Sequence, residues 1–246
     1  MKKLIFSAAL VLSLGLAGCG GGGGTASTGG GDSEKEDAKS AETKKEVKVL
    51  AEITKNTGSV WTDSIDSVWL HSAAIFENTG ETPVEIGETQ MNYKGTDDSI
   101  LGTSTMIYSV PSIILPGETA IIAESAILDG VTADEYAETT FNFNFDKTEE
   151  DPNVLEVSGT KGILGEYGYK ITGVVKNITE EQQDDVRLAA ALFDESGNLL
   201  GALQGSVDVG IAPGSEAGFE LSYPELSPEV MDKIATFEVK SYGWDW

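Results

Sequence analysis

An internal repeat is the feature of this sequence that most constrains its fold. The stretch LPGET at residues 115–119 returns as APGSE at residues 212–216, each time between two apolar runs. Proline fixes the corner of such a turn, and glycine supplies a left-handed backbone that a Cβ would penalise. The repeat therefore predicts a type II turn at the same site in two copies of one unit, with Gly117 and Gly214 at positive φ.

A second pair of markers keeps the same spacing in both copies. Asn78 and Gly102 lie 24 positions apart, and so do Asn177 and Gly201. An alternating apolar and polar run, typical of a β-strand, precedes each asparagine. The predicted copies span residues 47–148 and 153–246, and the DKTEEDPN segment at residues 146–153 is expected to be the only connection between them.

The spacing of the turn signals predicts the fold class. Short alternating runs are separated by turns rich in Gly, Asn, Asp and Pro, which is the pattern of an all-β sandwich. In each copy a helix start, at Thr132 or at Ser227-Pro228, precedes a closing alternating strand that begins near Thr139 or Ala235. We expect two tandem immunoglobulin-like antiparallel β-sandwiches, each with one short helix before its last strand.

The N-terminus has the pattern of an exported, lipidated protein. Two lysines precede an apolar run at residues 4–16, too short for a membrane-spanning helix but suited to a signal peptide. The run ends in LAGC at residues 16–19, which resembles the lipobox of bacterial lipoproteins. This resemblance implies a signal peptide at residues 1–18, cleavage between Gly18 and Cys19, and a diacylglycerol on the Cys19 thiol. The alternative is an ordinary secretory signal with an incidental cysteine.

The segment that follows predicts how the folded part is connected to the membrane anchor. Residues 19–46 change from Gly, Ser and Thr to mixed Glu and Lys with almost nothing apolar, which is typical of a flexible tether. We therefore expect a lipid-anchored protein on the extracytoplasmic face of a bacterial cell membrane, with a cell-wall or envelope protein as its partner.

Charge and cysteine content exclude several classes of function. With 41 acidic and 16 basic residues the net charge is −25, which repels nucleic acid phosphates and excludes DNA or RNA as a partner. Cys19 is the only cysteine, so its acylation would leave no thiol for disulfides or redox work. Burial and β-ladder hydrogen bonds must then stabilise the fold.

The second copy resembles the FxLYD family of bacterial extracellular domains. The matching stretch is AALFD at residues 190–194, followed by ESGN at residues 195–198 and preceded by Gly-x-Val-x-Asn at residues 173–177. Ala190 departs from the aromatic that opens the family motif, and Phe193 stands where the family has Tyr.

The first copy resembles the same family more weakly, through MNYKG at residues 91–95. Its ENTGETPVEI stretch is also similar to the immunoglobulin-like domains of secreted Gram-positive lipoproteins. Both resemblances imply a β-sandwich, and neither family has a catalytic site to transfer to this chain.

The inventory of catalytic groups is small. His71 is the only histidine, and its place in an alternating strand predicts a solvent-facing side chain rather than a general base. We therefore expect no enzyme activity and no cofactor. The triplet Asn177-Ile178-Thr179 matches an N-glycosylation acceptor, but we read Asn177 as a turn residue.

Three acidic clusters are expected to be solvated loop tips, with structural calcium left as the alternative. They lie at residues 97–98, at residues 146–151 and at residues 180–185. None of them has the alternating oxygen ligands of a calcium loop, so no metal site is predicted.

Four tryptophans lie near the ends of the repeats. Trp61, Trp69 and Trp244 are expected to cap the sandwich cores, whereas Trp246 is the candidate exposed aromatic contact. The resulting hypothesis is a non-catalytic extracellular binding or scaffolding module. Its alternative is a lipoprotein that binds a small ligand or a metal ion such as calcium.

Overall fold

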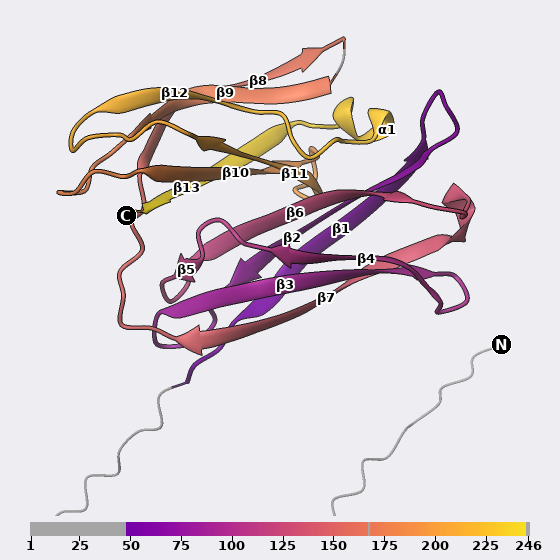
Figure 1. The fold of residues 1–246 in the computed structure, drawn as a ribbon, viewed down its shortest axis with the longest axis horizontal. Coiled ribbons are helices and arrows are strands. Elements are labelled where there is room, and N and C mark those ends of the chain that lie inside the picture. The colour runs from indigo at the N-terminus through magenta and orange to yellow at the C-terminus, as the bar shows by residue number, and fades with distance from the viewer. Residues whose placement is uncertain (1–47, 167, 245–246) are drawn as a thin grey trace, which may run out of the picture. The chain divides into compact units, whose positions relative to one another are not determined.

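The computed structural model describes residues 48–166 and 168–244, and their regular structure is almost entirely β (Figure 1). Cys19, Gly18, the tether and Trp246 lie outside the described residues. We call residues 48–148 the first half. Its strands are β1 (Glu52–Thr62), β2 (Val68–Glu77), β3 (Val84–Gly95), β4 (Ile100–Ile107), β5 (Ile113–Ile114), β6 (Thr119–Leu128) and β7 (Tyr136–Lys147).

Two antiparallel sheets enclose the core of the first half. Strand β2 lies between β1 and β6 in one sheet, and β3 pairs with β4, β5 and β7 in the other. Leu70 and Phe76 of β2 pack with Met91 and Tyr93 of β3, and all four are almost completely buried. Each such side chain contributes about 1.5–3 kcal/mol by leaving water.

The second half, residues 153–244, has the same two-layer arrangement. Its strands are β8 (Glu156–Gly165), β9 (Gly168–Lys176), β10 (Asp185–Phe193), β11 (Leu199–Val207), β12 (Glu216–Leu221) and β13 (Thr236–Trp244). Strand β9 lies between β12 and β8, and β10 lies between β11 and β13. Ile171 of β9 faces Leu188 and Leu192 of β10 in its core.

These antiparallel layers confirm the predicted all-β class and fit a β-sandwich. The described residues nevertheless group into one compact unit. The division into two tandem domains therefore stays a prediction.

The repeated asparagines have the same role in both halves. Asn78 is completely buried, and its Nδ2 donates to the carbonyls of Thr82 and Ile114 at 2.7 and 2.9 Å. Asn177 is also completely buried, and its Nδ2 donates to Glu181 and Ile211, both at 2.7 Å. Each amide thus ties one turn to the segment that leads into the Pro–Gly turn.

The Pro–Gly turns have the predicted geometry. Gly117 has a φ of 80° and Gly214 a φ of 74°. In both turns the residue after glycine donates its N–H to the carbonyl of the residue before proline at 2.9 Å. The glycine N–H donates to the carbonyl of Asn78 in one half, at 2.8 Å, and of Asn177 in the other, at 2.9 Å. The repeat therefore reflects structural equivalence at these two sites.

The two short helices are present, but without the predicted hydroxyl caps. The 3₁₀-helix η1 (Ala133–Glu135) precedes β7, and α1 (Pro228–Met231) precedes β13. Thr132 and Ser227 are at the N-cap positions, yet neither side chain accepts a backbone hydrogen bond there. Thr132 instead bonds to the carboxylate of Glu135 at 3.2 Å.

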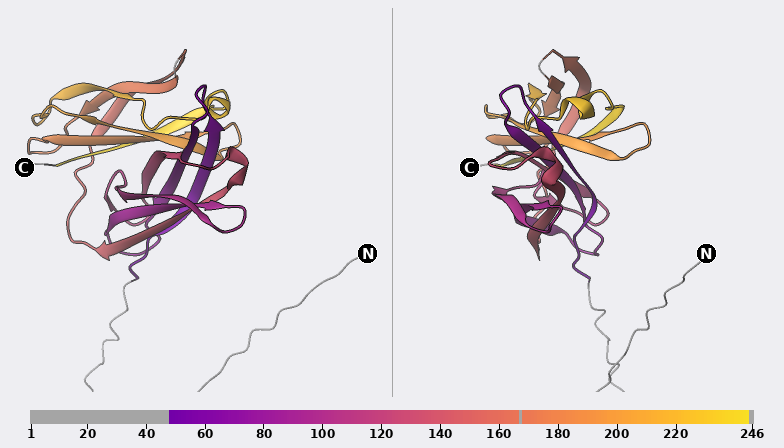
Figure 2. Two further views of the ribbon diagram at one scale, coloured as in Figure 1. Left: turned by 45° about the vertical axis from the view of Figure 1, so that its right-hand side comes forward. Right: turned by 90° about the vertical axis from the view of Figure 1, so that its right-hand side faces the viewer.

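A third apolar cluster packs the two halves against each other. Strands β2 and β6 of the first half face β10 and β11 of the second half, and Figures 1 and 2 show β11 beside β1, β2 and β6. Many side chains at this interface are alanines, which let the two sheets approach closely. The buried members are Ala73, Ile75, Val110, Ile121, Ala123, Ala189, Ala191, Leu199, Ala202 and Tyr242.

This interface corrects one sequence expectation. The DKTEEDPN segment at residues 146–153 was expected to be the only connection between the copies. In the structure β2 is buried from Leu70 to Phe76 and β10 from Leu188 to Leu192, so both central strands have two buried faces. Apolar–polar alternation identified the face of each strand that points into its own sandwich. Such alternation does not exclude that the opposite face is buried as well.

Candidate functional site

His71 is a buried interface residue, and the expectation that it faces solvent is wrong. It lies on β2 opposite Ser125 of β6, with no exposed surface. The backbone N–H of Ala202, in the second half, donates to His71 Nε2 at 3.2 Å. Gly201 makes this approach feasible, because a Cβ at that position would lie 2.8 Å from Nε2.

The hydrogen bonds of His71 define its protonation. Since Nε2 accepts from Ala202, the proton of the neutral ring is assigned to Nδ1, which lies 3.1 Å from Ser125 Oγ. Ser125 Oγ in turn donates to the carbonyl of Glu225 at 2.9 Å. Burial lowers the pKa of His71 to about 3, against a smaller opposing effect of the Glu225 carbonyl. The ring is therefore neutral and engaged on both sides at physiological pH.

Two more hydrogen bonds cross the same interface. Gln204 Nε2 donates to the carbonyl of Ala123 at 3.0 Å. The Tyr223 hydroxyl donates to Glu124 Oε1 at 2.7 Å, and burial together with this carboxylate raises the pKa of Tyr223. Polar groups and the apolar cluster thus fix the halves together.

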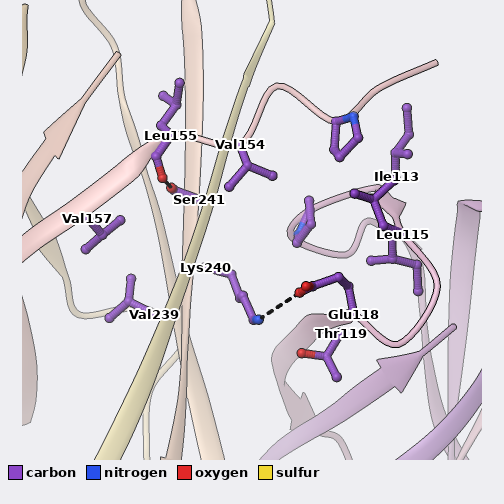
Figure 3. Close-up of a pocket in the computed structure, with 13 residues that line it drawn as sticks. Ile113, Leu115, Glu118, Thr119, Val154, Leu155, Val157, Val239, Lys240 and Ser241 are labelled. Carbon is purple, nitrogen blue, oxygen red and sulfur yellow. Dashed lines mark hydrogen bonds and ion pairs between the residues drawn. The ribbon is translucent and has the colours of Figure 1, made fainter. Parts of the chain in front are cut away.

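A cavity of about 340 Å³ opens beside this interface (Figure 3). Ile113 and Leu115, from β5 and the first Pro–Gly turn, line one side. Val154, from the segment between the halves, and Val239 of β13 line the other. Leu115 is 37% exposed and Val154 is 46% exposed, so apolar surface remains accessible. Its volume lies at the lower end of the range of small-molecule pockets.

Few polar groups reach this cavity. Lys240 Nζ lies 3.9 Å from Glu118 Oε2 across the space and 2.9 Å from Glu238 Oε1. Ser241 Oγ donates to the carbonyl of Leu155 at 2.9 Å. The sequence patterns did not identify this site, because its walls come from three segments distant in the chain.

Acidic residues of two of the clusters bond to residues close by in the sequence. Asp97 accepts from the Ser99 N–H at 3.0 Å, and its hydrogen bonds to Ser99 lower its pKa. Asp185 pairs with Arg187 through two bonds of 2.7 and 2.8 Å. Within the described residues, no three or more His, Cys, Asp and Glu side chains gather as metal ligands.

The tryptophans do not cap the cores as expected. Trp61 and Trp69 are cross-strand partners on β1 and β2, and their rings stack with centroids 6.1 Å apart. Trp69 Nε1 donates to Asp63 Oδ2 at 3.0 Å. Trp244 packs edge-on against Tyr242 at 4.6 Å. Pairing with a neighbouring aromatic places all three outside the apolar clusters.

Of the helices in residues 48–166 and 168–244, none has the length and apolarity required to cross a membrane. Cys19, the predicted lipidation site, and Gly18, which with Cys19 forms the predicted cleavage site, fall outside these ranges, as does Trp246.

Comparisons with known proteins leave the family open. No protein-family model matches the chain, and no curated protein is significantly similar to it. A solved calcium-binding mutant of Bacteroides uniformis β-glucuronidase 2 shares 11% identity over 68% of this chain and 23% of its own, with a TM-score of 0.21. A β-glucuronidase from glycoside hydrolase family 2 shares 12% identity over 72% and 20%, with a TM-score of 0.17. The chain spans less than a quarter of either protein, and such low scores support no conclusion.

Proposed function

We propose that this chain is a non-catalytic, lipid-anchored envelope protein that acts as an extracellular binding or scaffolding module. The LAGC motif supports an anchor at Cys19 on the extracytoplasmic face of a bacterial cell membrane. Two acyl chains hold a protein at a membrane far more firmly than one, which suits a diacylglycerol anchor.

The buried interface between the halves is the observation that supports a scaffold most directly. Sandwich domains joined only by a linker would move relative to each other. Here an alanine-rich apolar cluster and the His71–Ala202 hydrogen bond hold the two halves in one compact unit. A scaffold needs this fixed geometry to present two surfaces at a constant separation.

The role of His71 supports a non-catalytic function. It is the only histidine of the chain, and both ring nitrogens are used in hydrogen bonds at the interface. A general base must lie within hydrogen-bond reach of its substrate. This imidazole is buried and both of its nitrogens are already engaged, so its role is in packing.

Substitution of Cys19 tests the proposal in cells. In full-length Cys19→Ser no thioether can form, so the protein should appear in the medium or remain as unprocessed precursor. Wild type and the tether variant Ser27→Ala should stay in the membrane fraction and carry the added lipid mass. Membrane fractionation measures where the protein is found, and intact mass spectrometry measures whether it carries the lipid. A Cys19→Ser protein that is membrane-bound and normally processed would contradict the proposal.

A small apolar ligand is the second candidate, and the cavity beside the interface favours it. The partly exposed Leu115 and Val154 would cover an apolar group, while Lys240 and Glu118 lie where a polar end could bind. Calcium, the other ligand considered from the sequence, has no comparable support from the described acidic side chains.

A further inference from the structure

Strand β7 lies at the border of the first half, and one of its two edges is unpaired. It pairs with β3 along one edge, and within residues 48–166 and 168–244 no strand pairs with its other edge (Figure 1). The backbone N–H and C=O groups along such an edge can pair with a strand of another chain. The unpaired edge of β7 is therefore a potential site of association.

This edge is long and uninterrupted. The ladder between β7 and β3 has two register shifts. One adds a residue to β7 at Ala137, close to its start, and the other adds a residue to β3 opposite Asn144. From Glu138 to Lys147, β7 is therefore an unbroken strand, without the bulge that turns many edge strands away from a partner.

The middle of β7 has no charge that would prevent pairing. Residues 139–145 read TTFNFNF, with no charged residue, no proline and no glycine. Natural edge strands are usually kept from pairing by a lysine, a proline or a bulge. This run has instead the composition of a segment that pairs readily with another strand.

Other edge strands of the fold carry the protections that β7 lacks. Strand β1 has a bulge next to Lys55, and β8 has a bulge next to Lys161. Strand β12 is only 6 residues long and includes Glu216 and Glu220. The lack of such features on β7 therefore distinguishes its edge from these three.

The phenylalanines of β7 also favour a partner strand. Phe141, Phe143 and Phe145 pack against the core of the first half, yet all three remain partly exposed. Phe143 contacts Phe76 of β2, with ring centroids 4.6 Å apart. A strand paired with the free edge of β7 would extend the sheet and remove more of these rings from water, which is favourable.

We propose that two copies of this chain associate through β7, paired antiparallel about a two-fold axis at Phe143. In this register Phe143 lies opposite its own copy, Phe141 lies opposite Phe145, and Asn142 lies opposite Asn144. Directly opposite residues of antiparallel strands point to the same side of the sheet. Phenylalanines would therefore meet on the core side and asparagines on the other side.

Charge and side-chain pattern favour this register over its neighbours. It places Asp146 opposite Thr140, and no two like charges face each other across the pair. A register centred on Asn142 would place Glu138 opposite Asp146, and like charges directly opposite are destabilising. A shift of one residue would place phenylalanine opposite asparagine. The favoured register would form about nine backbone hydrogen bonds, close to the number in a typical protein interface.

Analytical ultracentrifugation of the full-length chain in excess detergent micelles tests the proposal. Salt at about 0.15 M screens the repulsion between two copies that each have a net charge of −25. We expect a monomer–dimer equilibrium with a Kd of about 100 μM or lower, and no larger species, because a two-fold pair uses the open edge of both copies. A chain that stays monomeric up to about 500 μM, or that forms open-ended assemblies, overturns the proposal.

Charge variants locate the contact. Asn142 and Asn144 are exposed. Asn142→Asp combined with Asn144→Asp would place carboxylates opposite each other in the dimer and should weaken association at least about tenfold. Asn142→Lys combined with Asn144→Lys should weaken it as well. An equimolar mixture of the two double variants should associate again, as a dimer with one copy of each.

A matched control uses another edge strand. Ser158→Asp combined with Thr160→Asp adds the same charge at exposed positions of β8 and should associate as wild type does. Circular dichroism would establish that all variants are folded. Wild-type association by the folded aspartate variant of β7, an equal loss in the β8 control, or a mixture that fails to associate overturns β7 as the contact.

Disulfide trapping tests the register. In full-length chains that carry Cys19→Ser no native thiol remains. A mixture of Asn142→Cys chains and Asn144→Cys chains should cross-link readily, because these positions lie directly opposite each other. Either variant alone should cross-link slowly, since its two copies would be diagonal neighbours about 7–8 Å apart. Faster cross-linking by either variant alone than by the mixture overturns the register.

Discussion

Mild acid should destabilise this fold through a single residue, His71. The imidazole is completely buried between the halves, and burial lowers its pKa from 6.5 to about 3. The folded protein therefore leaves this ring unprotonated until the solution is strongly acidic. In the unfolded chain, the same ring takes up a proton near its ordinary pKa.

The sign and size of the effect follow from this difference. Between pH 6.5 and about 3 the unfolded state binds more protons than the folded state, so the free energy of unfolding rises with pH. The stabilisation linked to His71 is complete above pH 6.5 and is lost progressively as the pH falls towards 3. At about 1.4 kcal/mol per pKa unit, acidification from about pH 6.5 to about pH 5 should cost roughly 2 kcal/mol.

Urea unfolding of the full-length chain measures this loss. Tryptophan fluorescence would follow the transition between about pH 7 and about pH 5, where exposed carboxylates remain largely ionised. His71→Gln is the matched control, because an amide does not titrate and its pH dependence should be nearly flat. A wild-type protein as insensitive to pH as His71→Gln would refute the reasoning, since His71 could then be protonated without opening the interface.

Two further substitutions test the repeat and the cavity. Gly214→Val should destabilise the second half by about 1–3 kcal/mol, because its φ of 74° is unfavourable for valine although no atom lies within 4 Å of a Cβ there. Gly117→Val should destabilise the first half in the same way. Hydrogen exchange would show which half each variant destabilises. Equal effects on both halves from either variant would argue against the structural equivalence of the two Pro–Gly turns. Val154→Asp should weaken binding of the neutral apolar dye Nile red in the cavity at least about tenfold, whereas the exposed control Val209→Asp should bind as wild type does. Similar dye binding by both variants would contradict a ligand site at the cavity.

The sequence predicted local geometry well, because turns depend on neighbouring residues. Gly117 and Gly214 have the expected positive φ, and the equivalent asparagines make equivalent bonds. These features follow from the limited set of backbone conformations that Pro, Gly and Asn favour. The all-β class followed from the period-two alternation between such turns.

Long-range packing was less accessible from the sequence. Alternation shows that a strand has two faces, but it does not show whether the outer face meets water or another sheet. The runs Ser72–Ala73–Ala74 in β2 and Ala189–Ala190–Ala191 in β10 were the available signal, since small side chains on both faces permit close packing. His71 was misread because the face of β2 opposite Leu70 was assumed to meet solvent.

The two β-bulges beside Thr89, one on β3 and one on β4, could not be predicted for a different reason. A bulge changes the strand register by one residue, and nothing in the local pattern of β3 or β4 marks its position. The cavity near Val154 depends in turn on three segments that meet only in the folded chain.

The long ladder between β1 and β2 also has a mechanical consequence. These strands pair from Glu52↔Glu77 to Thr62↔Val68, and the Glu81 N–H donates to the carbonyl of Lys48 just before β1. A pull on the chain ahead of Lys48, directed along β1, would load the ladder in shear, so its hydrogen bonds would have to break together. A pull perpendicular to the strand would instead break these hydrogen bonds one after another. The direction in which tension reaches residue 48 would therefore determine how much force the first half withstands.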